Sequence, residues 1–260
     1  MISVTSAQLQ AWLAAFLWPL ARVLALLANA PVFGSGSVPT RVKIGLGVLI
    51  TVLLVPTLGP QPAIDPASGA GLLVLAEQVL IGLAMGFAMK IVFDAVDLAG
   101  EIAGLQMGLG FAALYDPRAA SRVPVLAEYL GVVASLVFLA INGHLMVLAG
   151  LAESFRSFPV ALAPWGAPGL RALLEWSGRI FYFGLLLSLP LLAALLITNL
   201  ALGILTRSAP QLNIFAVGFP LTIFIGFAVL LMAVPALVPQ LGRFVEQASA
   251  VMLGVLGPAR

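Results

Sequence analysis

The stretch LLVLAEQVLIGLAMGFAMKIVFDAV, residues 72–96, decides the fold class of this chain. It exceeds the roughly 20 mostly apolar residues that a helix needs to cross about 30 Å of hydrocarbon. It also lacks the period-two alternation of polar and apolar residues that marks the strands of a membrane barrel. We therefore expect a membrane helix over Leu72–Val96.

Composition extends this expectation to the whole chain. Of 260 residues, 62% are hydrophobic and 8% are charged, whereas an ordinary soluble domain is about a quarter charged. The mean hydropathy is +1.15. Too few charged side chains are present to cover a water-exposed surface, which excludes a soluble two-domain protein and favours one membrane domain over residues 1–260.

Five further apolar stretches are long enough to be membrane helices. With the first, the set is Leu9–Ala28, Val38–Leu58, Leu72–Val96, Val125–Leu151, Ile180–Leu205 and Ile214–Val238. The connections between them are rich in Pro and Gly, which end helices. The sequence thus predicts an all-α, polytopic membrane fold of about six long hydrophobic helices. Lys and Arg are divided almost evenly between the two sides, so the positive-inside rule does not settle the orientation.

The chain lacks the residues that several functional classes require. The chain has no cysteine and one histidine, His144, so thiolate chemistry, disulfides and ordinary zinc sites are excluded. The net charge of +2 is spread thinly, without the basic stripe that nucleic-acid binding needs. No phosphate-binding loop of the form GxxxxGK[ST] occurs. We expect no catalytic residues, no cofactor, no metal and no nucleic-acid partner.

One face of a helix over residues 90–101 would carry charge. Lys90, Asp94, Asp97 and Glu101 follow one another at spacings of four, three and four residues, which places them on a common helix face. Charges at membrane depth usually face a helix bundle, a partner or water, and often have a function. The alternative is that Lys90 and Asp94 neutralise each other near the membrane boundary while Asp97 and Glu101 reach an aqueous vestibule.

Glycines beside this face predict close helix packing. Gly82 and Gly86, and then Gly100, Gly104 and Gly108, recur every four residues, so they form a smooth ridge that another helix can approach closely.

The residues that follow, GLQMGLGFAALY (104–115), combine glycines with Met and aromatic side chains. Met and Phe seal against water while glycines let the backbone move, so this segment could close a pore. A re-entrant packing segment without a gating role is the alternative. The candidate gate residues are Gly104, Gln106, Met107, Gly108, Gly110, Phe111 and Tyr115.

A tight reversal is expected between the last two apolar stretches. Pro210 stops one helix, Asn213 can cap the next, and Arg207 lies where a cation favours the exposed carbonyls at a helix end. The two stretches then form a long antiparallel hairpin. Arg22, Glu77 and Glu128, like His144, are interpreted as interhelical partners and not as catalytic groups.

Three segments together resemble the FliR family, the flagellar member of the export-apparatus proteins of type III secretion. They are FGSGSVPTRVKIGL (33–46), GEIAGLQMGLGFA (100–112 and on to Asp116-Pro117) and RSAPQLN (207–213). Their order and spacing extend the resemblance over nearly the whole chain.

The resemblance implies a subunit of the export gate in the bacterial inner membrane at the flagellar basal body. Its expected partners are FliP-like and FliQ-like subunits, an FlhB-like protein, unfolded flagellar export substrates and membrane lipid. Residues 1–178 would be FliP-like and residues 179–260 a FliQ-like hairpin with a C-terminal tail. The family's pore plug matches Gly104–Tyr115, with Met107, Phe111 and Tyr115 closing the pore.

Two other functions remain open at this point. A homologous subunit of a virulence secretion system would share the same motifs. A secondary transporter of a small solute would use Lys90, Asp94 and Asp97 at a midplane site, but it would also show internal repeats, and none is evident.

Overall fold

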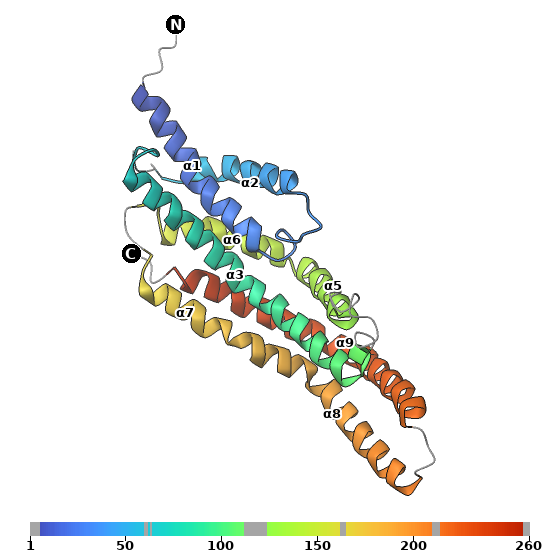
Figure 1. Cartoon of the computed structure of the whole chain (residues 1–260). Coiled ribbons are helices and arrows are strands. Elements are labelled where there is room, and N and C mark those ends of the chain that lie inside the picture. Colours follow the sequence, from blue (N-terminus) through green and yellow to red (C-terminus); the bar gives the residue numbers. More distant parts are fainter. Residues whose placement is uncertain are drawn as a thin grey trace. The chain divides into compact units, whose positions relative to one another are not determined.

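The computed structural model describes residues 6–59, 62, 64–111, 124–161, 165–209 and 214–256. Within these ranges the secondary structure is helical, without a strand (Figure 1). The α-helices are α1 (Ser6–Asn29), α2 (Thr40–Leu54), α3 (Gly69–Gln106), α5 (Val125–Ala140), α6 (Gly143–Ser157), α7 (Ala167–Ser177), α8 (Arg179–Ser208) and α9 (Ile214–Gly254). Two short 3-10 helices, η1 (Val55–Thr57) and η2 (Leu109–Phe111), follow α2 and α3.

The all-α membrane fold predicted from the sequence is confirmed, because each of the six apolar stretches carries helix. Two helices run further than predicted, α3 to Gln106 and α9 to Gly254. The extension of α3 is amphipathic: Asp97 and Glu101 are exposed, while Ala99 and Ala103 are buried. Because the charged residues and the small apolar residues lie on opposite sides, the helix can continue without burying charge.

The number of helices able to cross a membrane is four among the described residues, or five if one bent pair counts as a single span. The four are Thr40–Thr57, Gly69–Gln106, Ala167–Ser208 and Val217–Gly254. The bent pair is α5 and α6, which meet at 65° within the stretch predicted as one run. Asn142 stands at the break with a left-handed φ of 59°, a conformation that interrupts the helical ladder and that Asn tolerates.

The chain divides into two compact units. Unit 1 consists of Met1–Ile91, Asn142–Ser177 and Val245–Arg260, and unit 2 of Val92–Ile141 and Gly178–Phe244. Helices α3 and α9 therefore each contribute residues to both units.

In unit 1, α1 packs closely on the first half of α3. A Cβ added at Gly82 would meet the carbonyl of Arg22, and one at Gly86 would lie 2.9 Å from the Leu26 carbonyl oxygen. The absence of side chains at these two positions lets the backbones approach. Trp176 fixes α7 to the same helix by donating its indole N–H to the Ala88 carbonyl at 2.8 Å.

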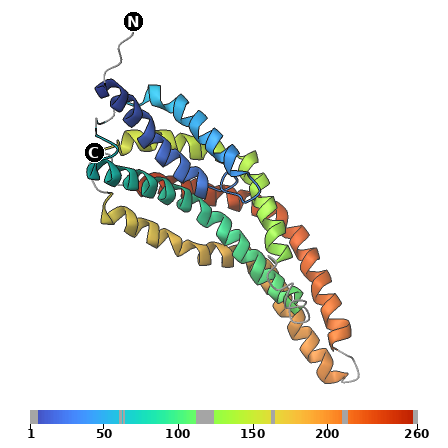
Figure 2. The same cartoon turned by 45° about the horizontal axis from the view of Figure 1, so that its top comes forward.

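In unit 2, α8 and α9 form the predicted antiparallel hairpin, and they run side by side in Figures 1 and 2. Phe183, near the start of α8, stacks on Phe244, toward the end of α9, with ring centroids 3.9 Å apart. This hairpin, α3 and α5 together line one small apolar cavity, and Ala99, Leu130 and Leu237 are among its lining residues. The four helices thus share one hydrophobic core.

Candidate functional site

The candidate gate segment begins where α3 ends. Met107 and Gly108 form the turn after the helix, with Met107 N–H bonded to the Ala103 carbonyl at 2.9 Å and Gly108 N–H to the Leu105 carbonyl at 3.0 Å. Gly108 has a φ of +82°, which an L side chain rarely adopts. A glycine in this left-handed conformation is the common way to end a helix, so the chain leaves α3 at this residue.

Met107 is fully buried although it follows the last residue of the helix. Its side chain lies against Gly226 of α9, where an added Cβ would come within 2.6 Å of Met107 Cγ and 2.7 Å of both Sδ and Cε. No side chain other than hydrogen fits at residue 226 while Met107 stays in place. Met107 and Gly226 are therefore complementary in shape.

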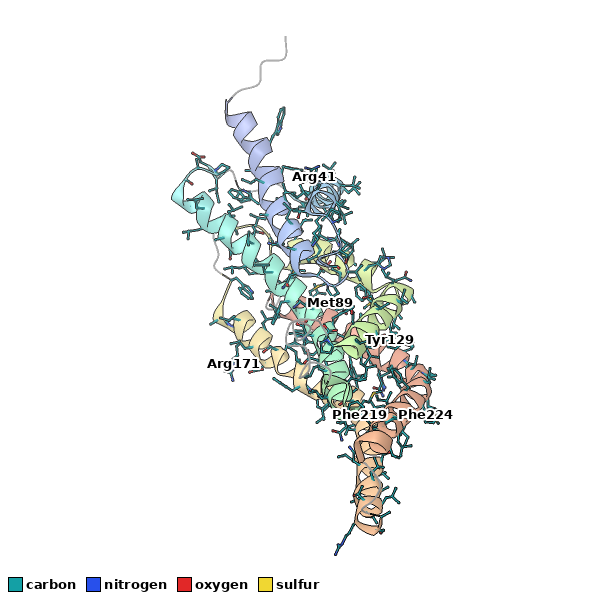
Figure 3. The ribbon with its side chains drawn as sticks, turned by 45° about the vertical axis from the view of Figure 1, so that its right-hand side comes forward. Arg41, Met89, Tyr129, Arg171, Phe219 and Phe224 are labelled. Atoms are coloured by element: carbon teal, nitrogen blue, oxygen red, sulfur yellow. The ribbon has the colours of Figure 1, made fainter. Side chains whose placement is uncertain are left out.

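Two more residues of α9 contact the same turn. The Thr222 hydroxyl lies 3.4 Å from the Met107 carbonyl oxygen and 3.0 Å from the Phe219 carbonyl oxygen of its own helix, so its proton has two acceptors. The ring of Phe219, labelled in Figure 3, covers Gly108, where an added Cβ would lie 3.0 Å from ring atom Cε2. Residues 219, 222 and 226 are spaced as neighbours on one helix face.

The other predicted gate residues are placed as follows. Gly104 is buried on α3, Gln106 is half-buried at its end, and Gly110 is exposed within η2. Phe111 belongs to η2 by its backbone, its side chain is not described, and Tyr115 lies outside the described residues.

The predicted charged face lies on α3. Lys90, Asp97 and Glu101 are exposed and Asp94 is half-buried. Asp97 lies beside α5, since a Cβ added at Gly131 would be 3.2 Å from Asp97 Oδ1.

The glycine ridge meets two different helices. Gly82 and Gly86 face α1, as described above, whereas Gly100 faces α5 so closely that an added Cβ would lie 2.7 Å from the Ala127 backbone nitrogen. At Gly104 the nearest atom would be Leu126 Cβ at 3.9 Å, an ordinary contact. The backbones thus approach closely at Gly82, Gly86 and Gly100, and only Gly104 of these four leaves room for a side chain.

Of the predicted hairpin motif, Arg207 lies exposed in the last turn of α8. Pro210 and Asn213 lie outside the described residues.

Arg22 joins three helices of unit 1, a role that the sequence indicated only as an interhelical contact. It is fully buried, and its Nε donates to Gln78 Oε1 of α3 at 2.8 Å. Nη1 donates to the Ser154 carbonyl at 2.9 Å and Nη2 to the Phe158 carbonyl at 3.0 Å, while the guanidinium lies 4.2 Å from the centroid of the Phe155 ring. Arg22 therefore supplies donors to two carbonyls at the end of α6, where the last carbonyls of a helix lack their usual intrahelical donors.

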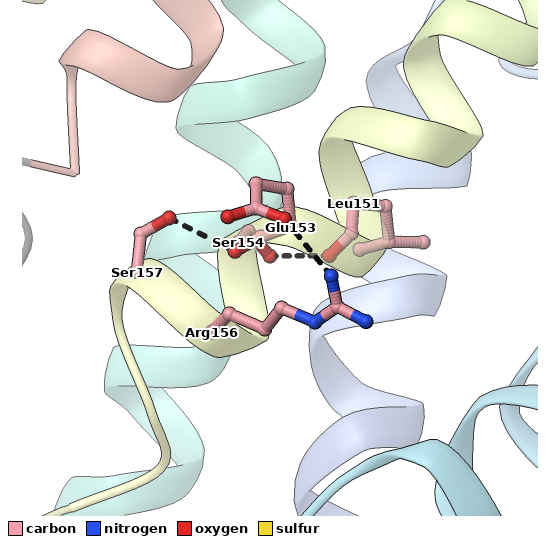
Figure 4. A network of polar contacts seen from close by, with 5 residues as sticks. All are labelled: Leu151, Glu153, Ser154, Arg156 and Ser157. Carbon is pink, nitrogen blue, oxygen red and sulfur yellow. Dashed lines mark hydrogen bonds and ion pairs between the residues drawn. The ribbon is translucent and has the colours of Figure 1, made fainter.

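The end of α6 is also held by its own side chains, as Figure 4 shows. Ser154 Oγ donates to the Leu151 carbonyl at 2.6 Å, and Ser157 Oγ donates to the Glu153 carbonyl at 2.9 Å. Arg156 pairs with Glu153 at 3.5 Å, with both side chains largely exposed. This exposed pair lies within α6 and contributes little, whereas Arg22 joins the end of α6 to α1 and α3.

Among the described residues, no group of three His, Cys, Asp or Glu side chains could hold a metal ion. The site that the geometry offers is instead the turn at the end of α3, which packs against α9 and continues into η2.

The comparisons with known proteins all find bacterial export proteins. The family model described as "Bacterial export proteins, family 1" matches residues 13–248. The chain is 44% identical over 239 residues to the flagellar biosynthetic protein FliR of Escherichia coli (strain K12), covering 92% of this chain and 91% of that protein. It is 31% identical over 220 residues to the FliR protein of Bacillus subtilis (strain 168), covering 84% and 85% of the two chains.

Proposed function

Because this chain belongs to the FliR family of bacterial export proteins, and is with that family a membrane component of flagellar protein export, we propose that it forms part of the export pore and contributes the plug that closes it. The pore would pass unfolded flagellar proteins. The plug is the segment Gly104–Tyr115.

The observation that supports the plug is the way α3 ends. The helix stops at Gly108, whose left-handed backbone redirects the chain, and an apolar segment with Gly110 and Phe111 leaves from that point. A mostly apolar segment without charged side chains can exclude water from a pore, because apolar side chains block hydrated ions without binding them. The glycines allow the segment to be displaced when a substrate passes.

The exposed apolar surface supports a role among other helices. On α8, Phe181 is 72% exposed and Ile197 is 69% exposed, and on α9 Phe224, labelled in Figure 3, is 72% exposed and Met232 is 81% exposed. Surfaces of this kind must be covered by lipid or by partner helices. We assign the partners to FliP-like and FliQ-like subunits, with an FlhB-like protein in contact, in the bacterial inner membrane at the flagellar basal body.

The internal division of the chain follows the same proposal. Residues 1–178 correspond to a FliP-like part, and residues 179–260 correspond to a FliQ-like hairpin made of α8 and α9. The role is structural and not enzymatic, so the energy for export comes from other components. The flagellar names of the relatives favour flagellar export over virulence secretion.

The test is ion leakage through the assembled complex. Replacing residues 109–115 with a Gly/Ser linker of the same length removes the apolar seal and spares the packed turn at Met107. Reconstituted complexes carrying this variant should conduct small ions at rest, whereas wild-type complexes should not. The control replaces residues 60–64, which belong to unit 1, with a Gly/Ser linker that also keeps the chain length unchanged. Background conductance in a correctly assembled linker variant would show that the segment is not a plug.

A further inference from the structure

The contact between the turn at Met107 and α9 links two segments more than a hundred residues apart in sequence. Thr222 reaches the Met107 carbonyl over a separation of 115 residues, and Gly226 accommodates the Met107 side chain. Phe219 covers the next residue, Gly108, with its ring. All of these residues belong to unit 2.

The three α9 residues have complementary tasks. Gly226 provides a notch in the helix surface, and the buried thioether of Met107 fills it. Thr222 offers its hydroxyl to the Met107 carbonyl at the end of α3, and the Thr222 residue is itself 7% exposed. Phe219 limits the space above Gly108, so the left-handed glycine cannot move toward α9.

We propose that Phe219, Thr222 and Gly226 form a latch on α9 that holds the plug in its closed position, and that opening requires Met107 to leave the notch at Gly226. This inference rests on the proposed function of the segment as a plug. It adds that α9 holds the base of the plug, the turn at Met107 and Gly108, so α9 is the element through which opening would be controlled.

The surrounding packing explains why α9 is suited to this task. Leu230 and Leu237 of α9 line the same apolar cavity as Ala99 and Ala103 of α3, so both helices contribute to the hydrophobic core of unit 2. Pro220, which lacks a backbone N–H, lies within α9 beside the latch and weakens the helical ladder there.

A disulfide provides the decisive test. Since an added Cβ at Gly226 would lie 2.6 Å from Met107 Cγ, the Cβ atoms of residues 107 and 226 would be about 4 Å apart or closer, near the 3.5–4.5 Å of natural disulfides. The chain has no cysteine of its own. In the assembled complex, oxidation of the Met107→Cys/Gly226→Cys variant should abolish export and keep resting ion conductance at background, and reduction should restore export. The single variants M107C and G226C cannot form this bond, so oxidation and reduction should leave the export rate of each one unchanged.

A second variant covers the case in which the cysteine pair does not assemble. Gly226→Leu fills the notch and displaces Met107, so the resting complex should leak ions. Gly242→Leu is the matched control, because an added Cβ at Gly242 of the same helix meets nothing within 4 Å. The latch is overturned if the oxidised cysteine pair exports at the wild-type rate, or if the G226L complex does not leak ions. In either case, ion leakage by the linker variant would still support the plug. A linker variant that does not leak refutes the plug itself.

Discussion

The ridge of glycines on α3 allows a quantitative test of packing at two neighbouring positions. Gly100 and Gly104 lie one helical turn apart, and both are buried. An alanine Cβ at residue 100 would meet the backbone of Ala127, including its nitrogen at 2.7 Å, whereas at residue 104 it would meet only Leu126 Cβ at 3.9 Å. Gly100→Ala should therefore force α3 and α5 apart, and Gly104→Ala should be accommodated.

The expected free energies follow from two opposing terms. Replacing Gly by Ala inside a helix stabilises it by about 0.8–1.0 kcal/mol. Overpacking a well-filled contact costs about 1–3 kcal/mol, and backbone atoms of α5 cannot rotate away as a flexible side chain would. The helix term is common to both variants, so the difference between G100A and G104A isolates the overpacking cost of about 1–3 kcal/mol.

The assay is the thermal stability of the purified export complex. For a chain of this size, 1 kcal/mol shifts the melting temperature by roughly 2–4 °C, so G100A should melt several degrees below G104A. The fraction of complex that survives heating, measured by size exclusion, reports this difference. Equal melting temperatures, or a more stable G100A, would refute the close approach of α3 and α5.

Two further predictions concern unit 1, which contains the four tryptophans and can be followed by their fluorescence. Arg22→Met removes the donors to Gln78 and Phe158, and the acceptors left without a donor should lower the free energy of unfolding by about 2–6 kcal/mol in total. Adding Gln78→Met should recover part of this loss. A double variant less stable than R22M would contradict this account of the Arg22 hydrogen bonds. Val32 has a φ of 66°, where a Cβ costs about 1–2 kcal/mol, so V32G should be more stable than V32A. Denaturation midpoints would check this order, which reverses the usual preference for Ala over Gly, and V32A as the more stable variant would rule out the strain.

Most of the fold could be predicted from continuous apolar stretches. Residues 72–96 and 214–238 lie within α3 and α9, and only the ends of these helices were underestimated. The bend between α5 and α6 carried a local signal, since Asn142-Gly143 is a dipeptide typical of turns. Hydropathy alone did not reveal it, because the residues on both sides are equally apolar.

The candidate site could be predicted only in part. The run from Gly104 to Tyr115 stood out by its composition, and its glycine spacing indicated close packing. Nothing in that run pointed to Gly226 as the position that accommodates Met107. Arg22 was recognisable as a charge in an apolar helix, but its partners at Ser154 and Phe158 lie more than 130 residues away.

The amino-acid sequence by itself determined that this chain is helical and belongs in a membrane. The reason is that in lipid every backbone polar group must be hydrogen-bonded within the protein, and long, continuously apolar runs without strand-like alternation meet that demand as helices. The tertiary structure alone decided which glycine meets which helix and where Met107 is held. Those contacts depend on the shapes of side chains brought together by chain reversals, and hydrophobic periodicity carries no record of them.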